Sequence, residues 1–345
     1  MTMSWRRFSP LWENANINAM IISKTPLRMS FVGGGSDLAS FYERHEGAVV
    51  SAAIDKYVFI TVNKKFDDAI RVSYSRTEMV DKVDDIQHPI VREGLRKLGL
   101  AGGVEITSIA DIPSGGTGLG SSSSFTAGLL NALHTYKKEI SSPETLAREA
   151  CEIEIDALKE PIGKQDQYAA AYGGLNFIRF CEDGTVSVDP VITKKETRQA
   201  LQENILMLYT GITRSASKIL QEQKRNTENE DRKFQIMKKM VALAHDLRDE
   251  LQKNNLAAFG PILHENWILK KEMAQGISSS EIDDWYETGR RHGAEGGKIL
   301  GAGGGGFLMF YAPRERHAEI ERALPNLRRL NTTFDYQGSK IIFIH

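Results

Sequence analysis

The first half of the chain alternates short apolar runs with turn residues, which is the pattern of β-strands. These runs predict strands over residues 21–23, 48–54, 57–63, 70–74 and 104–107. Apolar residues spaced three and four apart predict helices after His88-Pro89, from Phe125 onward and from Pro143 to Leu158. A hairpin over residues 175–191 then turns at Glu182-Asp183-Gly184.

The second half of the chain carries longer, charged helical patterns and fewer strands. Helices are predicted over residues 215–226, 232–253, 263–274 and 280–292, and strands over 205–209, 307–311 and 340–344. This mixture predicts an α+β domain with helices against one sheet. Because 345 residues exceed the usual size of one domain, we expect two domains, over residues 20–195 and 196–345. Residues 1–19 are expected to be a loose N-terminal extension.

Composition and charge limit the classes of partner. The formal net charge is −1, so nothing attracts nucleic acid or an anionic membrane, and we expect a small-molecule partner. Two cysteines cannot form a disulfide framework, and no apolar stretch approaches the roughly 18 residues of a membrane span. Arg6 and Arg7 are not followed by the apolar segment of a signal peptide. We expect a cytoplasmic protein, and a homodimer is compatible with the sequence.

The segment from Asp111 to Phe125 is rich in glycine and serine and joins a predicted strand to a predicted helix. Unpaired amides and the positive end of the helix dipole make such a junction a site for anions. No lysine precedes the serines as a Walker A loop requires, and Gly116, Gly118 and Gly120 lack the spacing of a dinucleotide fingerprint. A flexible linker is a weaker interpretation, because Pro113 and a strongly apolar helix accompany the loop.

Two further glycine clusters occur, at residues 33–35 and 303–306, and each adjoins a strand-like run. Either cluster alone could be only a turn or a connection. Three such loops in both halves of the chain instead suggest one cleft between two domains.

Together these segments resemble three motifs of the GHMP small-molecule kinases. The first is Pro26-x-Arg28-x-Ser30-Phe31-x-Gly33, the second runs from Pro113 to Ser122, and the third is Gly301-Ala302-Gly303-Gly304-Gly305. The resemblance covers roughly residues 21–344. It implies an α+β, two-domain GHMP kinase fold, with an N-terminal ATP-binding domain like domain 2 of ribosomal protein S5 and a ferredoxin-like C-terminal domain. It also implies ATP and Mg2+ as cofactors.

The resemblance further assigns site residues. The ATP-binding loop would comprise Pro113, Ser114, Gly115, Gly116, Thr117, Gly118, Leu119, Gly120, Ser121 and Ser122. Ser122 and Glu154 match the family's magnesium ligands, with Glu152 as a rival for Glu154. Asp166, which alone would read as a helix N-cap, matches the catalytic carboxylate, and Arg28 matches the arginine beside it. The expected substrate-binding residues are Asp37, Gly34, Gly35, Ser36, Gly303 and Gly304.

The substrate is expected to be a sugar phosphorylated at its C1 hydroxyl. Gly33-Gly34-Gly35 replaces the Gly-Glu-His of galactokinases, and the chain resembles the heptose 7-phosphate kinase branch more. Such a substrate needs a group for its distal phosphate, for which Lys164, Lys298, Lys270 and Arg179 stay open. The alternatives are another sugar-1-kinase, such as an L-fucokinase or a galactokinase-like enzyme, and a nucleotide sensor without catalytic activity. A dehydrogenase is disfavoured because the dinucleotide fingerprint is missing. No histidine spacing indicates a zinc site.

Overall fold

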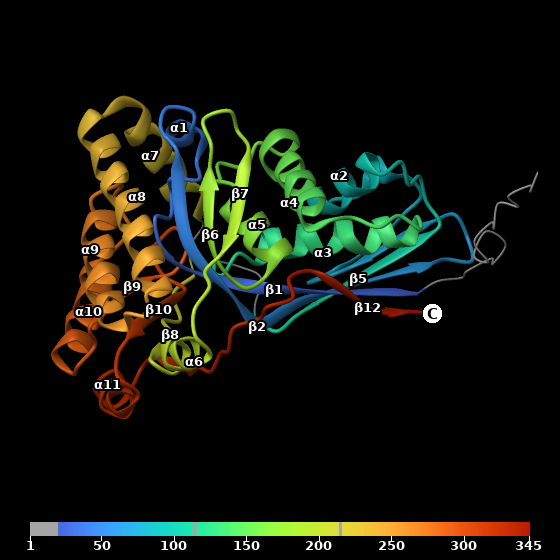
Figure 1. Cartoon of the computed structure of the whole chain (residues 1–345). Coiled ribbons are helices and arrows are strands. Elements are labelled where there is room, and N and C mark those ends of the chain that lie inside the picture. The colour runs from blue at the N-terminus through green and yellow to red at the C-terminus, as the bar shows by residue number, and fades with distance from the viewer. Residues whose placement is uncertain (1–19, 113–115, 214–215) are drawn as a thin grey trace, which may run out of the picture.

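The computed structural model describes residues 20–112, 116–213 and 216–345. Within these ranges, no helix combines the length and the apolar character that a membrane span requires. Two sheets and the helices around them form an elongated molecule (Figure 1). One end holds α8 (Asp231–Gln252), α9 (Phe259–Lys271) and α10 (Ser280–Arg291), and β5 (Val104–Ala110) and β12 (Lys340–Ile344) lie toward the other. The fold is α+β, as the sequence predicted.

The larger sheet has eight strands. They are β1 (Ile21–Val32), β2 (Gly47–Lys64), β3 (Ile70–Ser73), β4 (Thr77–Val80), β5 (Val104–Ala110), β6 (Leu175–Phe180), β7 (Val186–Pro190) and β12 (Lys340–Ile344). The order is β12-β1-β2-β5-β3-β4, and β2 also pairs with β6, which pairs with β7. Strand β2 joins these two parts because its first half pairs with β6 and its second half with β5.

Two strand predictions in this sheet were wrong. Residues 48–54 and 57–63 form one strand. The two residues between them are accommodated by a register shift in the pairing with β1, between Pro26 and Leu27. Strand β1 extends to Val32 rather than ending at Ser23. A proline is tolerated at position 26 because β12 pairs with β1 only from Ile21 to Lys24, which leaves one side of β1 unpaired beyond that point within the described residues.

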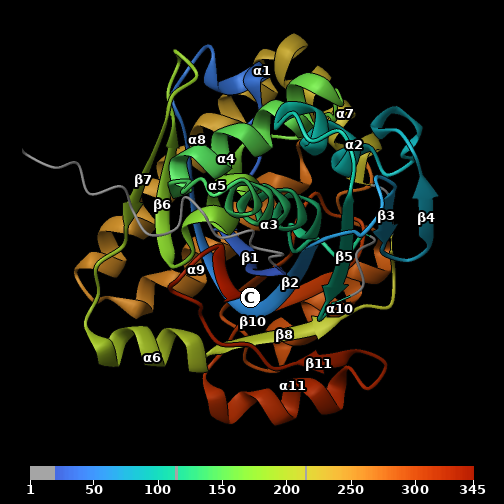
Figure 2. The ribbon, with the colours of Figure 1, turned by 90° about the vertical axis from the view of Figure 1, so that its right-hand side faces the viewer.

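The helices of the first half are α1 (Ala39–Tyr42), α2 (Pro89–Lys97), α3 (Ser121–Tyr136), α4 (Pro143–Cys151) and α5 (Gln165–Tyr172). Figure 2 looks nearly along α3, which packs on β1 and β2. Small residues allow the close approach: Ser23 Oγ donates to the carbonyl oxygen of Gly128 at 2.7 Å, and Ser124 Oγ donates to that of Pro26 at 2.8 Å. These contacts fix the start of α3 beside Arg28 of β1.

The second half folds around a four-stranded antiparallel sheet in the order β11-β8-β10-β9. Its strands are β8 (Ile205–Tyr209), β9 (Gly296–Ile299), β10 (Phe307–Tyr311) and β11 (Arg328–Leu330). Its helices are α6 (Lys195–Glu203), α7 (Ala216–Asn229), α8 (Asp231–Gln252), α9 (Phe259–Lys271), α10 (Ser280–Arg291) and α11 (His317–Ala323). The succession of β8, helices, β9, β10, α11 and β11 is the β-α-β-β-α-β arrangement of a ferredoxin-like domain. Helix α9 begins four residues before the predicted residue 263, since Pro261 lies in its first turn, where proline is accepted.

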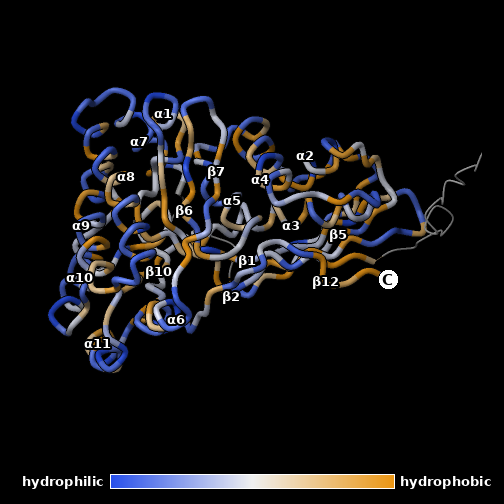
Figure 3. The backbone as a smooth tube through the Cα atoms, in the orientation of Figure 1, coloured by the Kyte–Doolittle hydropathy of each residue, from blue (hydrophilic) through white to orange (hydrophobic). Residues whose placement is uncertain are grey.

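The final strand, β12, returns to the larger sheet and pairs with β1. The sequence analysis placed residues 340–344 in the second domain, whereas in the structure they belong to the larger sheet. The chain therefore crosses between the two sheets twice. The end of β12 is apolar (Figure 3), and Ile342, Phe343 and Ile344 are exposed there. Aromatic contacts join the two halves into one core, with ring centroids 5.2 Å apart for Phe31 and Phe259 and 5.0 Å apart for Phe41 and Phe234.

Candidate active site

The three glycine loops meet at one cavity of about 320 Å3. Its lining includes Gly34 and Gly35 of the first loop, Gly116 to Gly118 of the second, and Gly301 of the third. Arg28, Asp37, Ser122 and Asp166 also line it. The structure therefore brings together residues that are up to 274 positions apart in the sequence, as Arg28 and Ala302 are.

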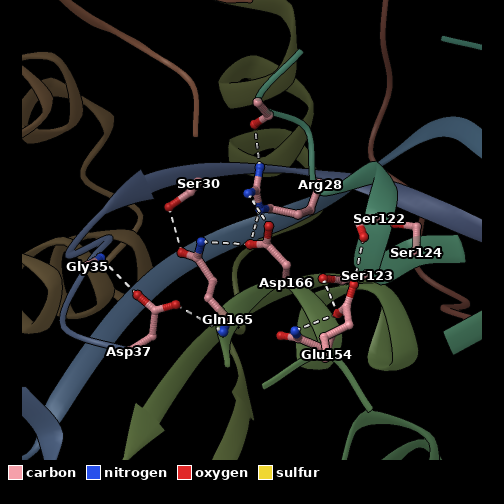
Figure 4. Close-up of polar contacts among 12 residues, drawn as sticks. Arg28, Ser30, Gly35, Asp37, Ser122, Ser123, Ser124, Glu154, Gln165 and Asp166 are labelled. Carbon is pink, nitrogen blue, oxygen red and sulfur yellow. Dashed lines mark hydrogen bonds and ion pairs between the residues drawn. The ribbon is translucent and has the colours of Figure 1, made fainter. Parts of the chain in front are cut away.

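Arg28 and Asp166 form a bidentate ion pair at the centre of this site (Figure 4). Arg28 Nε donates to Asp166 Oδ1 at 2.8 Å, and Arg28 Nη2 donates to Oδ2 at 2.6 Å. The arginine side chain is 4% exposed and that of the aspartate 27%, so the carboxylate is the partner that opens onto the cavity. Two planar forks paired in this way fix the orientation of both groups.

Two residues that the sequence analysis missed support this pair. Gln165 Nε2 donates to Asp166 Oδ1 at 3.1 Å, and Ser30 Oγ donates to Gln165 Oε1 at 2.7 Å. No sequence pattern marks a single glutamine or serine as a site residue, although Ser30 lies in the first motif and Gln165 directly precedes Asp166. Through these two hydrogen bonds, Ser30 of β1 and Gln165 hold the Asp166 carboxylate in one rotamer.

The second glycine loop is held against both Arg28 and the third loop. Arg28 Nη1 donates to the carbonyl oxygen of Gly118 at 2.7 Å, and the amide of Arg28 donates to that of Leu119 at 3.0 Å. Gly118 has φ +75°, and a Cβ atom there would lie 2.2 Å from the carbonyl oxygen of Leu300. Any other residue at 118 would push the second and third loops apart.

The first turn of α3 opens onto the cavity, because Ser121, Ser122 and Ser123 line it. The partial positive charge of a helix N-terminus favours phosphate there. The predicted residues Pro113, Ser114 and Gly115 lie outside the described residues, and Leu119 is buried away from the cavity. Thr117 lines the cavity with a buried Oγ1 that has no hydrogen-bond partner among the described residues.

Ser122 and Glu154, the predicted magnesium ligands, are in direct contact. Ser122 Oγ donates to Glu154 Oε1 at 2.7 Å, while Ser123 Oγ and Gln167 Nε2 donate to Oε2 at 2.8 and 2.7 Å. Glu154 is 1% exposed and lies in a π-helical turn, Glu152–Ala157, that continues α4. Burial raises the pKa of its carboxyl, and the three donors counter that effect.

Glu152, the rival ligand, lies on the surface and forms ion pairs with Lys97 and Arg148. Of these two glutamates, Glu154 is the one that contacts Ser122. Among the described residues no three His, Cys, Asp or Glu side chains form a metal cage. A hydroxyl and one carboxylate fit Mg2+, which takes most of its ligands from phosphates and water. Ser122 lines the cavity and Glu154 does not, and the Ser122 oxygen keeps its lone pairs for a cation while its hydrogen is donated to Glu154.

Asp37 faces the cavity on the other side of the ion pair (Figure 4). Its Oδ1 accepts from the amide of Gly35 at 2.8 Å, and its Oδ2 accepts from the amide of Gln165 at 3.2 Å. Burial raises the pKa of this carboxyl, and the charge of Asp166 raises it further. Both Asp37 oxygens keep free lone pairs for hydroxyl donors.

Three predicted substrate-binding residues do not line the cavity. Ser36 is buried, and its Oγ bonds the backbone of Ala48 on β2, so it closes the first loop instead. Gly303 packs against Ile277, and the amide of Gly304 donates to the carbonyl oxygen of Ile277 at 2.9 Å. These two glycines shape the third loop from behind, while Gly301 and Ala302 reach the cavity.

Comparison with known proteins places the chain in a family. The model of the GHMP kinases N terminal domain matches residues 87–174, and that of the GHMP kinases C terminal matches residues 247–328. A D-glycero-alpha-D-manno-heptose 7-phosphate kinase of Campylobacter jejuni is 29% identical over 320 residues, which is 88% of this chain and 93% of that protein. A bifunctional fucokinase/GDP-fucose pyrophosphorylase of Arabidopsis thaliana is 25% identical over 87% of this chain and 30% of that protein.

Solved structures of sugar kinases have the same fold. A D-glycero-D-manno-heptose 1-phosphate kinase from Bacteroides thetaiotaomicron superposes with a TM-score of 0.78 at 25% identity, over 94% of this chain and 99% of that chain. The galactokinase of Lactococcus lactis shares the fold, with a TM-score of 0.75 at 16% identity over 93% and 95%. Fold and site thus define an ATP-dependent phosphotransferase. The chain belongs to the GHMP kinases, as the three motifs indicated.

Proposed function

We propose that this protein transfers the γ-phosphoryl group of ATP to the anomeric C1 hydroxyl of D-glycero-D-manno-heptose 7-phosphate and forms the 1,7-bisphosphate. One observation carries the proposal: the first turn of α5 holds both carboxylates, since Asp166 belongs to it and the amide of Gln165 binds Asp37. A sugar whose hydroxyls bind Asp37 thus has a neighbouring hydroxyl beside Asp166. The Campylobacter relative, a heptose 7-phosphate kinase, supports this substrate class.

In this mechanism the C1 oxygen attacks the γ-phosphorus, the bond to the ADP oxygen breaks, and the hydroxyl proton passes to Asp166 Oδ2. Arg28 offsets charge beside the reacting atoms and anchors Gly118 of the phosphate loop. The start of α3 holds the triphosphate. Ser122 and Glu154 would hold Mg2+, which neutralises charge on the phosphates. Phosphoryl transfer depends mainly on such positioning and electrostatic stabilisation.

A coupled assay of ADP release tests the function across heptoses, fucose and galactose, with and without a distal phosphate. Heptose 7-phosphate is expected to give the highest kcat/KM. A preference for fucose or galactose would support the alternative of another sugar-1-kinase. Tight ATP binding without transfer to any sugar would support a nucleotide sensor instead.

The substitution Glu154→Gln is expected to raise the Mg2+ concentration needed for half-maximal activity by about 10-fold or more, the usual scale for lost metal support. The cause is the loss of the Glu154 carboxylate that contacts Ser122. Titration of activity with Mg2+ measures it, with the KM for sugar expected to stay unchanged. Glu152→Gln is the matched control, and an equal shift there would contradict the assignment.

The substitution Gly163→Ala is expected to lower kcat/KM for the sugar by about 10²-fold, as for a misplacement near 1 Å. A Cβ atom at position 163 would lie 2.1 Å from Asp37 Oδ2, so the carboxylate must move. Initial rates at varied sugar measure the effect, and the KM for ATP is the internal control. Unchanged sugar kinetics would remove Asp37 from the acceptor site.

We further propose a cytoplasmic location, which the free cysteines Cys151 and Cys181 support. A homodimer and the absence of nucleic-acid binding stay predictions.

A further inference from the structure

Two buried lysines in the cavity have no part in the mechanism above. Lys270 of α9 and Lys298 of β9 both line the cavity and are 4% and 3% exposed. Lys270 Nζ donates to the carbonyl oxygen of Gly34 at 3.0 Å and to Gln223 Oε1 at 2.7 Å. Lys298 Nζ donates to the carbonyl oxygen of Phe31 at 3.1 Å. Across the described ranges, neither ammonium forms a salt bridge.

Burying two ammonium groups against neutral oxygens is costly, because each loses its hydration without gaining a counter-charge. Desolvation lowers the pKa of Lys270 to about 8, although the charge of Asp37 opposes the shift. Desolvation lowers the pKa of Lys298 to about 7, and the charges of Lys270 and Arg28 add to it. Arg28, in contrast, is fully paired with Asp166. A buried pair of cations of this kind in a cavity is typical of a ligand site rather than of a stabilising core.

The position of the two lysines indicates which ligand group they face. In Figure 4 Asp37 and Gly35 lie on one side of the Arg28–Asp166 pair, and Ser122 and Glu154 lie on the other. Lys270 contacts Gly34, and Lys298 contacts the strand that leads into the same loop. Both lysines are therefore tied to the acceptor side of the cavity and not to the phosphate loop of α3.

We propose that Lys270 and Lys298 bind the phosphate group that the acceptor sugar already carries. This inference rests on the proposed sugar kinase function and adds which residues hold the distal phosphate of the substrate. An ammonium has three hydrogens, of which Lys270 uses two and Lys298 uses one in the contacts above, so donors remain for phosphate oxygens. A phosphate dianion supplies the negative charge with which the two ammonium groups can pair.

The other two cations that the sequence offered for this role lie elsewhere. Lys164 Nζ donates to the carbonyl oxygen of Gly184 at 2.6 Å and lies over the ring of Tyr42. Arg179 pairs with Asp189 at 3.3 Å. Neither side chain is part of the cavity lining, so the structure selects two of the four candidates.

The test compares D-glycero-D-manno-heptose 7-phosphate with the free heptose, by calorimetric binding and by initial rates at saturating ATP. The parent protein is expected to bind the phosphorylated sugar at least about 10-fold more tightly than the free sugar. Lys270→Gln and Lys298→Gln should each weaken binding of the phosphorylated sugar by about 10- to 100-fold, the scale of one charged hydrogen bond. Binding of the free heptose and the KM for ATP should stay within about 3-fold.

Arg179→Gln is the matched control and should change none of these values. An equal loss for both sugars in a folded variant, or a rise in the KM for ATP instead, would overturn the assignment. If a thermal melt shows that either variant is unfolded, the deciding measurement is competition by inorganic phosphate for sugar binding to the parent protein. Inorganic phosphate should compete with binding of heptose 7-phosphate but not of free heptose, and competition with neither would also overturn the assignment.

These arms separate the inference from the function on which it rests. Equal binding and turnover of both sugars by the parent protein would overturn the phosphate site and leave a sugar kinase. Selective binding of the phosphorylated sugar without any transfer from ATP would support the phosphate site and reject the proposed function.

Discussion

Replacing Asp166 by asparagine is expected to lower kcat by about 10²- to 10⁴-fold, the range for loss of a positioned general base. Asparagine has the same shape, and its amide oxygen can still accept one of the two Arg28 hydrogen bonds, so the side-chain position should change little. It cannot take the C1 proton, and it removes the negative charge that the arginine fork is placed against. The loss should therefore appear in kcat, with the KM values for ATP and sugar nearly unchanged.

Steady-state kinetics with both substrates varied measure this effect, and a thermal melt shows that the variant folds. Asp156→Asn is a suitable control, since Asp156 is exposed and is absent from the cavity lining. Turnover of Asp166→Asn within a few-fold of the parent would remove Asp166 from the chemical step.

Replacing Arg28 by lysine is expected to lower kcat by about 10²-fold and also to raise the KM for ATP, since one ammonium cannot replace three fixed hydrogen bonds of the guanidinium. Two of those bonds orient Asp166 and the third holds Gly118. The expected rise in the KM for ATP distinguishes this variant from Asp166→Asn. Arg96→Lys, at an exposed ion pair, is the control.

A double-mutant cycle tests whether the two residues act as a unit. Since Arg28 acts largely through Asp166, the double variant should lose only a few-fold more kcat than Asp166→Asn alone. Fully multiplied losses would mean that Arg28 acts independently of the carboxylate.

The sequence predicted that the three glycine loops meet at one cleft because each adjoins a strand-like run and together they occur in both halves of the chain. The resemblance also placed Arg28 beside Asp166, 138 positions away, and the two form the ion pair at the centre of the site. Ser122 and Glu154 were likewise paired by the resemblance, and the structure places them 2.7 Å apart. The resemblance favoured Glu154 over its rival Glu152, and in the structure Glu154 contacts Ser122 while Glu152 pairs with Lys97 and Arg148.

Other features depend on long-range packing that local patterns do not encode. The predicted first strand ended at Ser23, whereas β1 continues through Pro26, which is tolerated because β12 pairs with β1 only as far as Lys24. Ser36, Gly303 and Gly304 looked like site residues from their motifs, whereas packing against Ala48 and Ile277 turns them away from the cavity. The sequence left Lys270 and Lys298 among four candidates for a distal phosphate, and only the packing of α9 and β9 against the first loop buries these two.

The central claim is that this site phosphorylates the anomeric hydroxyl of a heptose phosphate. Phosphorus and proton NMR of the product, formed from heptose 7-phosphate with ATP and Mg2+, tests it most directly. The account predicts one new phosphorus resonance coupled to the anomeric proton, together with the original resonance at C7 and one equivalent of ADP. A new phosphate at any other carbon, or no transfer, would contradict it.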